Sequence, residues 1–160
     1  MMTKVDPKDV QRLRSESGAG VMDCKRALEE TSGDFAKALA LIKERGIQSV
    51  AKKSEREAKE GVIASYIHGN KRVGALVELA SETDFVSRGE EFQKLAQEIA
   101  MQVAAMEPAS VDELLEQPYI RDASKKIKDL VTDVAATTKE NVHVRRIQRF
   151  ALGESLDSSR

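Results

Sequence analysis

The N-terminal part of the chain alternates between short apolar stripes and turn residues, a pattern that predicts three helices. Asp6 is a good N-cap and Pro7 suits a first helical position, so the first helix begins there. A Gly-Ala-Gly break at 18–20 separates it from the second helix. The third helix, at 35–45, carries an apolar stripe, and Gly46 supplies its C-terminal stop.

A polar segment and a hairpin follow these helices. Residues 47–60 are almost entirely polar, with opposite charges at helical spacing, and predict a solvated connecting helix. The aliphatic and β-branched runs at 62–67 and 73–79 flank His-Gly-Asn-Lys-Arg, a turn-forming sequence. Two antiparallel strands are therefore expected.

The remainder of the chain is mainly helical in pattern. Apolar positions at helical spacing predict a long helix over about 85–106, and weaker patterns predict helices at 111–116 and 123–139. The segment 141–152 alternates apolar residues with arginines and predicts a third strand. The expected fold class is α+β, with a three-stranded antiparallel sheet packed against helices.

These patterns divide the chain into four parts. We expect a three-helix module at 1–46, a polar linker helix at 47–60, an α+β core at 61–153 and a flexible tail at 154–160. A length of 160 residues accommodates one small module beside a larger one.

Composition and charge narrow the possible partners. Hydrophobic residues make up 41% of the chain and charged residues 33%, as in a soluble globular protein. A net charge of -1 removes the general attraction for phosphate that drives nucleic-acid binding, so no direct nucleic-acid partner is expected. Residues 61–120 carry four Lys or Arg and ten Asp or Glu. This acidic segment suits a basic partner surface, although a solvated helix face has the same composition.

Candidate chemistry is sparse. Cys24 is the only cysteine, which excludes an intrachain disulfide and favours a reducing, cytoplasmic location; we expect it to be a half-buried packing residue. His68 and His143 lie near no plausible metal ligands, and no nucleotide-binding or hydrolase motif occurs. No apolar stretch approaches the roughly 20 residues that span a bilayer, and no signal peptide is recognisable. We expect no catalytic residue, metal, cofactor or membrane partner.

One junction is unusual, because a predicted strand becomes a helix where acidic residues meet an aromatic ring, at 81–86. Thr83 or Asp84 can cap the helix while Phe85 folds onto the core. Alternatively, Asp84 and Phe85 form a wedge that enters another protein. The ring would then separate packed elements, while the carboxylate repels phosphate oxygens or competes for a hydrated magnesium ion. The residue types leave both interpretations open.

Two segments closely resemble the elongation factor Ts family. They are Leu-Arg-Ser-Glu-Ser-Gly-Ala-Gly-Val-Met-Asp-Cys-Lys-Arg-Ala-Leu at 13–28 and Thr-Asp-Phe-Val at 83–86. The resemblance extends in order over nearly the whole chain, through 33–34, 51–53, 60–63 and 144–146.

The resemblance implies a guanine-nucleotide exchange factor for elongation factor Tu that makes no chemical bonds itself. In the family, a three-helix module similar to a ubiquitin-associated domain docks on the GTPase, and Arg14, Val21 and Met22 match positions that touch it. The Thr-Asp-Phe-Val element enters near the bound magnesium, which implies this role for four residues of the chain: Thr83, Asp84, Phe85 and Val86. GDP-bound and nucleotide-free elongation factor Tu are the implied partners.

The chain departs from the family pattern at a few points. Ser17 stands where Thr is common, and Gly89 stands where Asn is frequent. Gly89 is expected within the first helical turns, where it costs about 1 kcal/mol relative to Ala and would let the tip flex. Long members have two related core subdomains, whereas short members resemble this chain and pair as homodimers. A bare sheet edge also favours such pairing.

Two rival functions remain. The three-helix module can serve a binding adaptor that recognises a ubiquitin-like or other helical partner without exchange activity, although the Thr-Asp-Phe sequence at 83–85 argues against it. An enzyme that uses Cys24 or a histidine is the third possibility.

Overall fold

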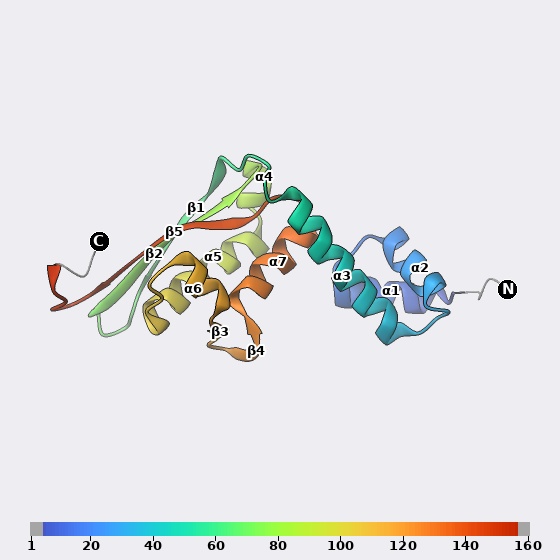
Figure 1. Ribbon diagram of the computed structural model, residues 1–160, viewed down its shortest axis with the longest axis horizontal. Helices are drawn as coiled ribbons and strands as arrows, with labels where there is room; N and C mark the ends of the chain where they lie inside the picture. Colours follow the sequence, from blue (N-terminus) through green and yellow to red (C-terminus); the bar gives the residue numbers. More distant parts are fainter. Residues whose placement is uncertain (1–4, 157–160) are drawn as a thin grey trace.

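The structure is a computed structural model that describes residues 5–156. Its helices are α1 (Pro7–Ser17), α2 (Val21–Glu30), α3 (Phe35–Lys53), α4 (Asp84–Ser87), α5 (Glu90–Met106), α6 (Val111–Glu116) and α7 (Ile127–Thr138). Its strands are β1 (Glu60–Ile67), β2 (Val73–Ser81), β3 (Pro118–Tyr119), β4 (Asp122–Lys126) and β5 (His143–Ala151). The molecule is elongated, with α1 and α2 towards one end and the main sheet towards the other (Figure 1).

The three N-terminal helices pack around a small core of their own. The Asp6 carboxylate caps α1 by accepting from the Lys8 backbone N–H at 2.8 Å. Gly18 ends α1 with a φ of +68°, in the left-handed region that favours glycine. The fully buried side chains of this cluster are Leu13, Cys24, Ala27, Leu28 and Ala38. Cys24 is therefore a core residue rather than the half-buried residue expected.

Gly46 does not end the third helix, contrary to prediction, because α3 continues to Lys53. A Cβ added at Gly46 would lie 3.4 Å from the Ala136 Cβ, so the glycine is the point where α3 passes close to α7. Beyond it, Val50 packs against the main core, which stabilises the extra helical turns. The polar segment 47–60 is thus helical only in its first half.

The main core lies between the three-stranded sheet and α5, and α7 packs against α5. The strand order is β1-β2-β5, and both strand pairs are antiparallel. In the middle of β2, buried Ala75, Val77 and Leu79 alternate with the less buried Leu76 and Glu78, so one face of the sheet meets the helices. The expected α+β class with a three-stranded antiparallel sheet packed against helices is confirmed.

Two predicted helices have different limits in the structure. The helix expected over 85–106 is divided into α4 and α5, and Gly89 is the N-cap of α5 with an extended ψ of 145° rather than an interior helical residue. The helix expected from 123 begins at Ile127, because residues 122–126 pair with β3 as a second hairpin. Tyr119 anchors this hairpin by donating to Glu98 of α5 at 2.5 Å, and burial together with this bond raises the pKa of Tyr119 to about 12.

Other expectations fall partly outside the described residues. The predicted flexible tail at 154–160 includes 157–160, which lie beyond the described range. The division at 46/47 and 60/61 stays a prediction. No helix among residues 5–156 is long and apolar enough to cross a membrane.

Candidate functional site

The segment 83–86 lies where β2 ends and α4 begins, at the end of the sheet nearest α3 (Figure 1). Thr83 is the N-cap of α4, and its hydroxyl accepts from the Val86 backbone N–H at 3.4 Å. Helix α4 has only four residues, and Gly89 separates it from α5. We call the residues 83–86 the tip.

Phe85 and Val86 lie in opposite environments within this tip. The Phe85 ring is 86% exposed, whereas Val86 is partly buried and packs against the main core. One interpretation of the sequence combined a capped helix with a buried Phe85. The cap is present, but Phe85 does not fold onto the core. The apolar ring projects into solvent from a helix whose other apolar side chain is anchored.

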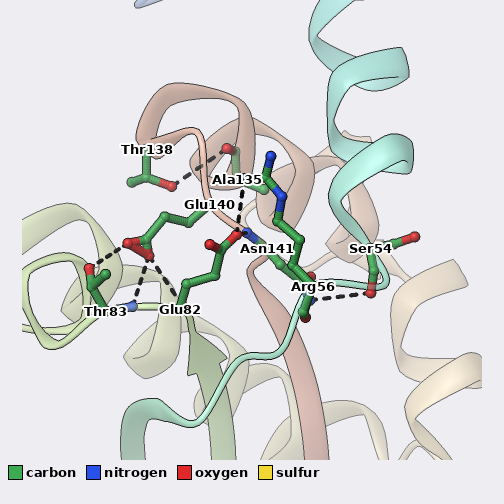
Figure 2. Close-up of polar contacts among 8 residues, drawn as sticks. All are labelled: Ser54, Arg56, Glu82, Thr83, Ala135, Thr138, Glu140 and Asn141. Carbon is green, nitrogen blue, oxygen red and sulfur yellow. Dashed lines mark hydrogen bonds and ion pairs between the residues drawn. The ribbon is translucent and has the colours of Figure 1, made fainter.

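The backbone of the tip is held by Glu140, a carboxylate that is only 9% exposed (Figure 2). Its Oε2 accepts from the backbone N–H groups of Glu82 at 3.2 Å and Thr83 at 3.1 Å. Its Oε1 accepts from the Thr83 hydroxyl. Hydrogen bonds to an ionised carboxylate are stronger than neutral ones, so three donors converge on one strong acceptor.

Asn141 makes a second link between this tip and the end of α3 (Figure 2). Its backbone N–H donates to Glu82 Oε1 at 2.7 Å. Its side-chain amide donates to the carbonyls of Ser54 at 3.2 Å and Arg56 at 2.6 Å. The Arg56 guanidinium also lies 3.7 Å from Glu82. The chain that leaves α3 is thereby tied to the base of the tip.

Asp84 is exposed and pairs with Arg88 one turn later, at 3.1 Å. An exposed ion pair of this kind contributes only about 0–1 kcal/mol, because water screens both charges. The Asp84 carboxylate can therefore exchange Arg88 for a partner's group at small cost.

Sequence reasoning missed Glu140 and Asn141 as parts of this site. Glu140 lies 57 residues from Thr83 along the chain, and its position just before a predicted strand gave no periodic signal. The only local signal for these two residues is that they are polar and lie between the apolar patterns of α7 and β5. In the structure both are buried.

The three candidate docking residues belong to the helices on either side of the α1–α2 turn. Val21 and Met22, at the start of α2, are 47% and 57% exposed, and Arg14 in the last turn of α1 is also exposed. A Cβ added at Gly18 would lie 3.3 Å from Thr137 Oγ1 of α7, so this turn also touches the core module. A groove of about 810 Å³ lies between the turn, α3 and α7.

The structure does not bring the docking residues and the tip together, because α3 lies between them (Figure 1). Within residues 5–156, no group of three or more His, Cys, Asp or Glu side chains is arranged to hold a metal ion. The tip presents an exposed aromatic ring and a carboxylate on a backbone held by hydrogen bonds. The docking residues form a separate exposed patch.

Comparison with known proteins identifies the family. A model of the family described as elongation factor TS matches residues 82–158. Elongation factor Ts of Prochlorococcus marinus is 41% identical over 202 aligned positions that cover 98% of this chain and 93% of that protein. Elongation factor Ts of Anaeromyxobacter dehalogenans, strain 2CP-1, is 39% identical over 201 positions that cover 98% and 92%.

These alignments are longer than the 160-residue chain, so the relatives contain internal residues that this chain lacks. A third relative, elongation factor Ts of Oleidesulfovibrio alaskensis, is 39% identical and is covered over its whole length. The similarity thus extends across both the N-terminal helices and the sheet. The chain belongs to the elongation factor Ts family and is a translation elongation factor.

Proposed function

We propose that this chain is a guanine-nucleotide exchange factor for elongation factor Tu and promotes GDP release by protein binding alone, without bond-making chemistry. Family membership supports this proposal. The observation that carries it is the Phe85 ring, 86% exposed on a tip whose backbone is fixed by a buried carboxylate. Translation takes place in the cytoplasm, so the proposal locates the chain there.

The physical basis is differential binding. A protein accelerates nucleotide release when it binds the nucleotide-free partner more tightly than the GDP-bound partner. Each tenfold difference in affinity corresponds to about 1.4 kcal/mol. An inserted aromatic ring and a carboxylate near phosphate and magnesium both favour the nucleotide-free form, because both compete with contacts that hold GDP.

In this proposal, Phe85 enters an apolar pocket of the partner and Asp84 acts on the magnesium ion. Thr83 and Val86 hold the tip, through the cap of α4 and through core packing respectively. Gly89 does not loosen the tip from within a helix, since it is the cap of α5. Glycine is well tolerated at such a cap.

The N-terminal helices supply the docking contact in the same proposal. Val21 and Met22 present apolar side chains that are about half exposed at the start of α2, and the exposed cationic Arg14 lies in the last turn of α1. A contact at this distance from the tip stabilises the complex without touching the nucleotide. Docking residues should therefore set the affinity, and the tip should set the maximal rate of release.

We also propose that the chain pairs as a homodimer through the uncovered face of the sheet. Register places Ile67, Gly74 and Phe150 in one row, and Leu76 lies in the next row of the same face. The exposed fractions are 64% for Ile67, 63% for Phe150 and 46% for Leu76. Apolar side chains clustered in this way favour burial against a second copy.

Stopped-flow release of labelled GDP from elongation factor Tu tests the proposal. The chain should accelerate release strongly, and the acceleration should weaken in excess magnesium. An Arg14→Ala, Met22→Ser variant should need more protein for half-maximal acceleration but reach a similar maximal rate. Binding without any acceleration would favour the adaptor alternative.

A further inference from the structure

We infer that Glu140 is a positioning residue for nucleotide exchange: it holds Thr83 so that Asp84 and Phe85 meet the partner in one fixed orientation. This inference rests on the proposed exchange function. Glu140 does not touch the partner itself, because it is 9% exposed and lies behind the tip. Its effect on exchange is expected to pass entirely through the residues that follow Thr83.

The first support is the convergence of donors on this carboxylate. Glu140 binds two consecutive backbone N–H groups and one hydroxyl, at the last residues before α4. Because two consecutive backbone N–H groups and the Thr83 hydroxyl bind the same carboxylate, both the position and the direction of the backbone entering α4 are fixed. The Thr83 hydroxyl donates to Glu140 and accepts from Val86, so one oxygen joins the anchor to the helix cap.

The second support is that the tip has few other means of keeping its shape. Helix α4 has four residues, and helices this short are not stable on their own. The Phe85 side chain is 86% exposed, so packing within residues 5–156 does little to orient it. Val86 and the Ser87 side chain, which donates to the Asp84 carbonyl at 3.1 Å, anchor the far end of α4. At the end that enters the helix, the buried Ser81 hydroxyl donates to the Thr83 carbonyl at 2.9 Å. Glu140 holds the Glu82 and Thr83 N–H groups and the Thr83 hydroxyl at the same end.

The third support is the backbone turn at Lys139, which places Glu140 next to the tip. Lys139 has a φ of +60°, which ends α7 and turns the backbone sharply. Glu140 and Asn141 follow this turn and bind the two ends of Glu82. The Glu140 carboxylate accepts from the Glu82 backbone N–H, and the Asn141 backbone N–H donates to the Glu82 carboxylate. Two neighbouring buried polar residues thus hold one junction, although neither belongs to a helix or strand.

The most informative substitution is Glu140→Gln, which keeps the size of the side chain. A carboxylate offers two acceptor oxygens, whereas an amide offers one oxygen and an NH2 group that would face donors. If the amide oxygen keeps the two backbone N–H groups, the NH2 group meets the Thr83 hydroxyl, which must then accept instead of donate. Glu140→Gln should therefore replace three charge-assisted contacts by weaker neutral ones. Thr83→Val removes the hydroxyl from the opposite side of the same contact, and Thr83→Ser restores it.

Glu98→Gln is a matched control. Glu98 is another poorly exposed carboxylate that accepts from Tyr119 and pairs with Arg121 at 3.2 Å, away from the tip. This variant should lose stability but release GDP normally per folded molecule. A difference between Glu140→Gln and Glu98→Gln then reports on the tip rather than on general destabilisation.

GDP release from elongation factor Tu is measured for each variant over a range of concentrations, at equal folded fraction. Glu140→Gln and Thr83→Val should lower the maximal rate about tenfold or more with little change in half-maximal concentration, because a misplaced group loses effectiveness steeply. Thr83→Ser should recover most of the rate. In a Phe85→Ala background, Glu140→Gln should have less than about a twofold further effect, since both changes act on one step.

Hydrogen exchange of the free chain gives a readout that does not involve elongation factor Tu. The Glu82 and Thr83 amides should exchange faster in Glu140→Gln, while amides of the core strand β2 stay protected. If Glu140→Gln and Thr83→Val both release GDP at the unmodified rate, the positioning role is wrong and the exchange function stands. If the unmodified chain does not accelerate release at all, the exchange function fails and takes this inference with it.

Discussion

Phe85 and Val86 are sequence neighbours whose side chains have different roles in the structure. Val86 packs against the main core, while the Phe85 side chain is 86% exposed. Sequence alone left open whether Phe85 folds inward, because an N-cap followed by an aromatic residue fits both arrangements. The structure resolves that question through burial.

The two residues should therefore respond in opposite ways to truncation. Phe85→Ala should change the free energy of unfolding by no more than about 0.5 kcal/mol, as expected for an exposed side chain. Val86→Ala should cost about 1 kcal/mol, because it removes partly buried methyl groups. Urea denaturation of both variants measures this, and a larger loss in Phe85→Ala than in Val86→Ala would contradict the assignment.

Glycine positions explain why some elements were predictable and others were not. Gly18 was recognised as a break, and it does end α1 with a φ of +68°. The sequence predicts a helix end at Gly46 as well, yet Gly46 lies inside α3 because packing of Val50 and close contact with α7 outweigh its low helix propensity. Local pattern identifies a glycine but does not reveal which neighbour approaches it.

Substitution of these two glycines should separate the two cases. Gly46→Ala should raise stability by about 0.5–1 kcal/mol, because alanine favours the helix and its Cβ would lie 3.4 Å from Ala136. Gly18→Ala should lower stability by about 1–2 kcal/mol, because an L-residue is strained at its positive φ. Thermal melts of the two variants test this, and the same sign for both would be inconsistent with the structure.

The candidate site was predictable only in part, for a related reason. The Thr-Asp-Phe-Val sequence stands out by its residue types and by resemblance to a family. Glu140 carries no such mark, because its role depends on a contact across 57 residues of sequence. The hairpin β3–β4 was missed in the same way, since the exposed residues of β4 have no apolar alternation.

At the scale of the whole molecule, residues 5–156 present exposed apolar surface at two places besides the tip that bear on partner binding. One is the start of α2 near Met22, and the other is the sheet face around Ile67 and Phe150. They lie towards opposite ends of the molecule (Figure 1). One surface can therefore engage elongation factor Tu while the other is buried against a second copy of the chain.

The homodimer should depend on this sheet face. Sedimentation at tens of micromolar should give a dimer for the unmodified chain, because the clustered apolar side chains leave water on pairing. An Ile67→Ser, Phe150→Ser variant should sediment as a monomer with an intact melt, whereas Val21→Ser should stay dimeric. A monomeric unmodified chain that is still active in exchange would exclude the dimer.

The central claim is that Phe85 acts on the nucleotide site of the partner, and GDP release by Phe85→Ala tests it most directly. Release from elongation factor Tu is followed at matched folded concentration, beside Ile120→Ala, which truncates an exposed apolar side chain on the β3–β4 turn. Loss of a buried interface anchor typically costs about 2 kcal/mol or more, or roughly thirtyfold. We predict that Phe85→Ala loses about this much exchange while Ile120→Ala keeps it all. Unchanged release by Phe85→Ala would contradict the account.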